Sequence, residues 1–176
     1  MNWDSLLADL ESSFEAERRA DVAAQAADLA EAEIAGLHLV DRLRGAVGRP
    51  VHVRTRGGVA VDGVVKRVED AFALLDEGEG IESLVPVAAI VLASPLPGPA
   101  PTPTVRRRPG IQVALRGLAR SGTRVRVVFA QGEATGRIVR VGADYLDLAR
   151  DGVVTGPGAS GTVTIALEAI EVVRSR

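Results

Sequence analysis

The stretch Gly136-Arg-Ile-Val-Arg-Val141 decides the fold, because it rewrites Gly63-Val-Val-Lys-Arg-Val68 from the first half of the chain. Each stretch opens on a glycine and continues with a strand-like mixture of apolar and charged residues. The neighbouring segments also match in order, as three pairs: 51–53 with 125–127, 72–75 with 145–148, and 85–90 with 165–170. Such self-similarity predicts an internal repeat, in which one small β unit occurs twice.

A short apolar-periodic segment precedes each β unit. The first contains Leu37, Val40, Leu43 and Val47 and stops at Gly48-Arg49-Pro50; the second contains Ile111, Ala114, Leu115, Leu118 and Ala119 and stops at Ser121-Gly122. Spacing of three and four residues followed by glycine is typical of a short helix and its C-terminal end. Each repeat is therefore predicted to be one helix followed by a β meander. The glycines at 63 and 136 are expected where the long strand bends.

The first 36 residues predict a long amphipathic helix. Trp3, Leu7, Leu10 and Phe14 recur at heptad spacing, and no proline occurs before Pro50. Arg18 interrupts the apolar stripe, which resumes at Val22. An apolar stripe on a helix must be covered by another surface, so these four residues are expected to form an association helix.

Proline and arginine dominate the segment between the two units, Ser94 to Pro109. Dense proline removes backbone donors and fixes φ, so the segment is expected to be an extended, semi-rigid linker. The predicted organisation is an acidic helix at 1–36, a first β unit at 37–93, the linker at 94–109 and a second β unit at 110–176.

The order helix, strand, bent strand with Gly-x-hydrophobic-x-x-hydrophobic, two further strands and a Val-Pro-Val-x-Ala-Ile ending resembles the Sm-like fold. The resemblance implies an α+β protein: a long N-terminal amphipathic helix, then two tandem Sm-like five-stranded small β-barrels, each preceded by a short helix. The chain also resembles an actinobacterial set of small proteins often labelled Fis-type regulators. That label requires a C-terminal helix-turn-helix, whereas residues 162–173 read as strand, turn and strand.

The residues with which RNA-binding Sm proteins read uridine are not found at the matching positions. Glu69 and Gly142 stand where the family has Asp, and Ala73 and Leu146 stand where it has Asn. The family's Arg-Gly pair is replaced by Pro86-Val87 in one unit and by Ala166-Leu167 in the other. The resemblance therefore does not carry over a base-reading pocket.

Charge is distributed unevenly along the chain. Residues 1–36 contain nine acids against Arg18 and Arg19, and residues 104–140 contain nine arginines against Glu133. Six of those arginines follow the second short helix and the next two strands: Arg116, Arg120, Arg124, Arg126, Arg137 and Arg140. They predict a weak, sequence-nonspecific RNA or DNA interface through phosphate contacts. A solvated surface, or a contact with the acidic helix within or between chains, explains the same pattern.

Enzyme signals are poor. Gly156-Pro-Gly-Ala-Ser-Gly161 spells a dinucleotide-binding motif, but a strand is expected after it and not the helix that would hold a pyrophosphate. The histidines at 38 and 52, and the carboxylate pairs 69–70 and 144–147, have no nucleophile or base grouped with them. Cysteine is absent, so no zinc-thiolate site is expected, and no catalytic residue, metal or cofactor is predicted.

These observations favour a non-enzymatic oligomerising or protein-interaction module, with nucleic-acid binding as the alternative. Sm-like units leave strand edges that pair, and the N-terminal helix supplies a second association surface. No apolar run reaches the length that spans a bilayer. We expect a cytoplasmic protein that binds itself or another protein and no membrane.

Overall fold

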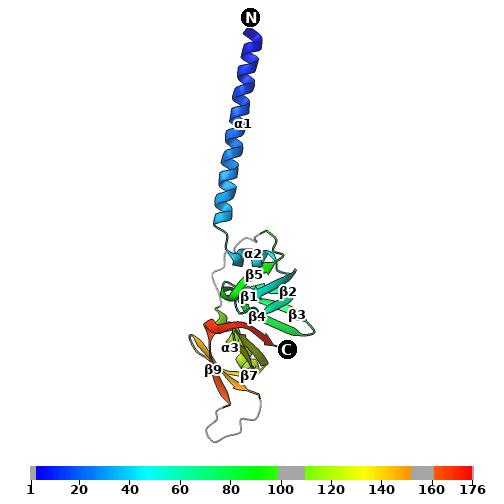
Figure 1. The fold of residues 1–176 in the computed structure, drawn as a ribbon, viewed down its shortest axis with the longest axis vertical. Coiled ribbons are helices and arrows are strands. Elements are labelled where there is room, and N and C mark those ends of the chain that lie inside the picture. The colour runs from blue at the N-terminus through cyan, green and yellow to red at the C-terminus, as the bar shows by residue number, and fades with distance from the viewer. Residues whose placement is uncertain (1–2, 99–109, 152–160, 176) are drawn as a thin grey trace. The chain divides into compact units, whose positions relative to one another are not determined.

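The computed structural model describes residues 3–98, 110–151 and 161–175 (Figure 1). The chain divides into two units, Met1–His38 and Leu39–Arg176. The linker expected at 94–109 lies mostly outside the described residues, as does most of the glycine-rich segment at 156–161.

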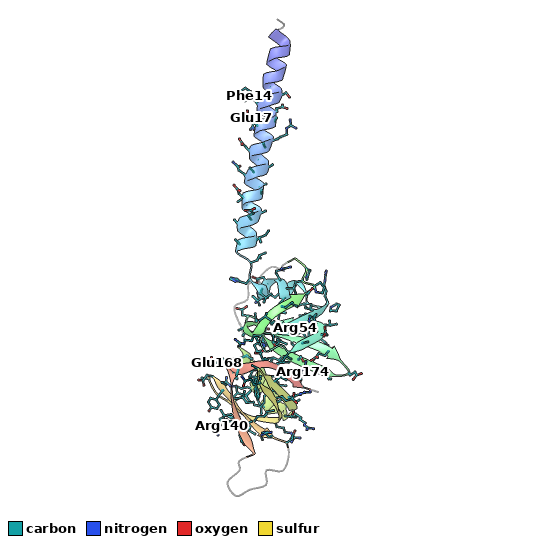
Figure 2. The ribbon with its side chains drawn as sticks, in the orientation of Figure 1. Phe14, Glu17, Arg54, Arg140, Glu168 and Arg174 are labelled. Atoms are coloured by element: carbon teal, nitrogen blue, oxygen red, sulfur yellow. The ribbon has the colours of Figure 1, made fainter. Side chains whose placement is uncertain are left out.

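The first unit is a single helix, α1 (Trp3–Ala35), which confirms the long N-terminal helix. Gly36 follows it, and the Gly36 backbone N–H donates to the carbonyl of Ala32. Phe14, Val22 and Leu29 have 68%, 61% and 69% of their side-chain surface exposed. Figure 2 shows Phe14 projecting from the helix. Nothing within the unit covers these side chains, so the association expected of the helix stays a prediction.

The described residues of the second unit form two short α-helices, two single-turn 3₁₀ helices and ten strands. The elements of its first half are α2 (Leu39–Gly45), β1 (Pro50–Thr55), β2 (Ala60–Val68), β3 (Phe72–Gly78), β4 (Ile81–Pro86), η1 (Val87–Ala89) and β5 (Ile90–Ser94). Those of its second half are α3 (Ile111–Ser121), β6 (Arg124–Phe129), β7 (Gly132–Val141), β8 (Tyr145–Arg150), β9 (Thr162–Ala166), η2 (Leu167–Ala169) and β10 (Ile170–Ser175).

All ten strands belong to one open antiparallel sheet with the order β5-β1-β2-β3-β4-β10-β6-β7-β8-β9. The prediction of two tandem Sm-like five-stranded barrels, and of an internal repeat of such closed units, is therefore wrong. Neither set of five strands closes on itself, because β4 pairs with β10 through Leu84↔Val173, Ser83↔Arg174 and Glu82↔Ser175. Figure 1 shows β10, in red, at this central position.

The physical reason for the single sheet is that β4 is buried on both faces. Val85 points into the first core, with Val53, Val61 and Leu75. Leu84 points the other way and belongs to the second core, together with Phe72 of β3 and Val173 of β10. In return, Val172 of β10 is buried in the first core. Each half thus contributes side chains to the core of the other, and two independent barrels would expose them.

The two glycines of the matching stretches allow a close approach between strands. A Cβ at Gly63 would lie 2.5 Å from the carbonyl oxygen of Asp76, and a Cβ at Gly136 would overlap the carbonyl oxygen of Ala149. The strand register shifts two residues later, between Val65 and Arg67 and between Ile138 and Arg140. The glycines are required because backbone of the next strand occupies the place of a side chain.

Replacing Gly136 by Val is expected to lower the free energy of unfolding by about 1 kcal/mol or more, because the new Cβ would push β7 away from β8. Chemical denaturation measures the change. Gly117→Ala is the matched control: no heavy atom lies within 4 Å of the added Cβ, and alanine favours a helix by about 1 kcal/mol over glycine. If Gly136→Val left the denaturation midpoint unchanged, the close approach of the β8 backbone to Gly136 would be contradicted.

Candidate association surface

The open sheet has two free edges. β5 is hydrogen-bonded to β1 on one side only, and β9 to β8 on one side only. Each edge strand therefore carries a row of backbone N–H and C=O groups without a strand partner in the described part of the chain. Such rows accept another strand unless side chains or covering segments prevent it.

The β5 edge is apolar. Its sequence, Ile90-Val-Leu-Ala-Ser94, contains neither charge nor proline, two of the devices that proteins use to keep edges apart. The side chain of Val91 is 64% exposed and that of Leu92 is 47% exposed. Val91 is the extra residue of a bulge, because Thr55 faces Ile90 and Arg54 faces Leu92. Two exposed branched aliphatic side chains on an edge strand are typical of an association surface.

The β9 edge differs, because its outer face is polar. Thr164 is exposed, and its hydroxyl donates to Oδ1 of Asp147 on β8 at 2.7 Å. Nη1 of Arg140 lies 3.9 Å from Oδ2 of the same aspartate. This edge is polar and charged, and it offers little apolar surface to a partner.

The junction between β4 and β10, at the centre of the sheet, is stabilised by Glu171 of β10. Its side chain is only 2% exposed. The backbone N–H of Gly57, in the turn after β1, donates to Oε2 of Glu171 at 3.1 Å, and Nε of Arg56 lies 3.4 Å from Oε1. A buried carboxylate is tolerated because both of its oxygens accept hydrogen bonds.

A second ion pair crosses the same junction. Nε of Arg174, labelled in Figure 2, donates to Oε1 of Glu77 at 2.7 Å. The hydroxyl of Ser83 donates to the same carboxylate. Together with Glu171, this pair ties β10 to the first half of the unit.

Replacing Glu171 by Ala is expected to lower the free energy of unfolding by about 2 kcal/mol, because the N–H of Gly57 and the guanidinium of Arg56 would lose their shared acceptor and a buried side chain would be removed. Thermal or urea denaturation measures the loss. Glu168→Ala is the control, since Glu168 is exposed and only its backbone carbonyl, an acceptor for Arg56 at 2.8 Å, takes part in the junction. Equal effects of the two substitutions would show that the Glu171 carboxylate does not hold the junction.

The arginines predicted as a nucleic-acid interface come together only in part. Arg124 of β6 stands directly opposite Arg137 of β7, and Arg126 stands opposite Arg174 of β10. Arg140 follows on β7 beyond the register shift. Arg116 and Arg120 are exposed on α3, and no ion pair of either is found among the described residues. The sheet thus brings together Arg124, Arg126 and Arg137.

Acidic side chains that sequence reasoning did not pair with these arginines neutralise much of their charge. Arg124 forms an ion pair with Asp151 at 2.5 Å, and Arg126 forms one with Glu133 at 2.7 Å. Nε of Arg137 donates to the carbonyl of Gly122, at the C-terminal end of α3, at 3.1 Å. A phosphate would have to displace these partners, which lowers the affinity that the arginine count suggests.

A cleft of about 500 Å³ lies where α3 begins, between η1 and η2. Its lining is mostly apolar, with Arg56, Gln112, Asp144 and Glu168 as polar members. Arg56 already contacts Glu168 and Glu171, and Gln112 donates to the carbonyl of Ala143 at 3.1 Å. The described lining residues of the cleft include no serine, threonine, lysine or histidine, so the cleft shows no arrangement of nucleophile and base.

Three of the groups considered as catalytic candidates contact a charged partner. Glu69 pairs with Arg67 at 2.6 Å, and Asp70 pairs with Arg44. His52 Nδ1 lies 2.7 Å from an oxygen of Asp62 at the protein surface. Over residues 3–98, 110–151 and 161–175, no group of three metal-ligating side chains is found.

One aspartate of the β3–β4 hairpin has a lowered pKa. The backbone N–H of Gly78 donates to Asp76, and Lys66 Nζ lies 3.0 Å from it, so both stabilise the charged carboxylate. The same contact raises the pKa of Lys66. Because both partners are exposed, this pair orders the hairpin surface and carries no catalytic signature.

Comparison with models of known protein families gives no match, and no curated protein matches the sequence. The family resemblance drawn from the sequence therefore stays untested. None of the helices in the described part of the chain has the length and apolar character needed to cross a membrane.

Proposed function

We propose that the chain is a non-enzymatic association module, which binds a protein partner by completing the free edge of its ten-stranded sheet. One observation carries the proposal: β5 is an edge strand, paired on one side only, on which Val91 and Leu92 are exposed and which contains no charge or proline. The chain already joins its two halves in this way, through β4 and β10. The exposed apolar side chains of α1 supply a second surface for association.

Leu92→Lys tests the proposal, because a charge on an edge strand prevents pairing with another strand. We expect the mass measured by light scattering to fall, and to reach that of a monomer when residues 1–34 are also removed. Val139→Lys is the matched control. Val139 is 59% exposed on β7, which is paired on both sides with β6 and β8, so this substitution should leave the mass unchanged.

A chain that lacks residues 1–34 separates the two surfaces. If β5 alone is sufficient for association, the shortened chain still has the mass of an assembly. Its mass falls to that of a monomer only when Leu92→Lys is added. An intact wild-type chain that is monomeric at every concentration, with no other protein bound on co-purification from cells, would contradict the proposal.

Phosphate binding by the arginines of β6 and β7 is the second candidate, since Arg124 and Arg137 face each other on one surface. If four to six arginines neutralise phosphates, the log–log slope of affinity against salt should be roughly −3 to −5. The double substitution Arg124→Ala with Arg137→Ala should reduce that slope by about 2 units. Titration of a labelled oligonucleotide at several salt concentrations gives the slope.

The control for the arginine experiment is the pair Arg54→Ala and Arg67→Ala, which removes the same charge from the first half of the unit. Equal losses from the two pairs would show a general charge effect and no arginine site. Absence of binding at low salt, with or without residues 1–34, would remove nucleic acid from consideration.

A further inference from the structure

We propose that the partner of β5 is the β5 strand of a second copy of this chain, paired antiparallel about a twofold axis. This inference rests on the proposed function and identifies the partner. The alternative for two copies is a heterologous contact, in which β5 of one copy adds to β9 of another. The β4–β10 junction shows what such a contact would need, so the two arrangements can be compared residue by residue.

The registers identify which residues of β5 and β10 hold matching places. In β10 the residue facing β6 changes from Ile170, opposite Phe129, to Val172, opposite Val128, so Glu171 is the extra residue of a bulge. In β5, Val91 is the extra residue. Three residues further on, Arg174 and Ser94 occupy matching places.

β5 cannot reproduce the polar contacts of β10. At the central junction, Glu171 accepts a hydrogen bond from Gly57, and Arg174 donates to Glu77. The matching residues of β5 are Val91 and Ser94, which offer neither a carboxylate nor a cation. The hydrogen bond to Gly57 and the ion pair with Glu77 that β10 makes at the central junction therefore have no counterpart at a β5–β9 contact.

β9 cannot reproduce the apolar surface of β4. Leu84 of β4 stands beside Leu74 of β3, and both pack against the second core. At the matching place, Thr164 of β9 stands beside Asp147 of β8. The carboxylate of Asp147 is only 15% exposed, but the side chain of Arg140 beside it is 72% exposed. A partner that covered this face would take Arg140 and the hydroxyl of Thr164 out of water, which carries a desolvation penalty.

Pairing of β5 with itself avoids these penalties. An antiparallel pair related by a twofold axis is self-complementary, so the Val91 and Leu92 side chains of one copy meet the apolar strand of the other. The strand contains no charged residue, so twofold pairing places no like charges opposite each other. The nearest charged residue across the register is Arg54 on β1, labelled in Figure 2. The two Arg54 strands would be about 14 Å apart, further than the screening length.

The absence of cysteine from the chain permits a direct test by disulfide cross-linking of the full-length protein. We would oxidise three variants, singly and in pairwise mixtures: Val91→Cys, Leu92→Cys and Ala93→Cys. The mixtures are needed because a residue on the twofold axis faces its own copy, whereas a residue off the axis faces a different residue of the other strand. We expect at least one of these samples, in which every cysteine lies on β5, to form a covalent dimer. Its yield of dimer should be on the order of tenfold or more above that of Val139→Cys.

The heterologous arrangement has its own cross-link. Transfer of the Val173↔Leu84 register places Ala93 of one copy beside Thr164 of the next, so a mixture of Ala93→Cys and Thr164→Cys would join. Cross-linking of that mixture without any β5-only dimer would overturn the proposal. So would the absence of every cross-link. The mass of Leu92→Lys decides separately whether β5 mediates association at all, so the two failures are distinguishable.

Discussion

The pairing of β4 with β10 is the constraint on which the rest of the second unit depends. It places Leu84 in the second core and Val172 in the first, so neither half can bury its side chains without the other. Glu171 adds polar specificity, because its buried carboxylate accepts the N–H of Gly57 from a turn more than one hundred residues earlier in the chain. With β4 and β10 occupied, β5 and β9 remain as the edges of the sheet.

The two remaining edges have different chemistry although elements follow in the same order on both sides of the linker. The outer edge with exposed Val91 and Leu92 is apolar, and the edge with Thr164 and Asp147 is hydrogen-bonded and charged. A sheet with one apolar edge and one polar, charged edge favours a closed dimer over a chain of copies that grows without limit. Such a chain would require β5 of each copy to pair with β9 of the next, so both edges would have to favour association. This asymmetry links the fold to the proposed association.

The arginines show why a charge count alone does not define a site. The excess along residues 104–140 is large in the sequence, but Asp151 and Glu133 pair with Arg124 and Arg126 once the strands are in register. Asp151 lies beyond residue 140, and Glu133 comes close to Arg126 only across the β6–β7 turn. Electrostatic partners on neighbouring strands follow from register, which charge patterning along the chain does not contain.

The sequence by itself determined the local elements. The spacing of apolar residues and the absence of proline placed α1, and helical spacing before Gly122 placed α3, because both depend on contacts a few residues apart. It also located Gly136, which structure explains by the backbone of Ala149. One signal was missed: Ser83-Leu-Val-Pro86 is a continuous buried run rather than an alternating one, the mark of a strand covered on both faces. Only the tertiary structure decided that β10 pairs with β4 and that β5 is left at the edge. The backbone hydrogen-bonding groups of an edge strand are the same for every partner, so the choice of partner depends on side-chain packing between residues far apart in the chain.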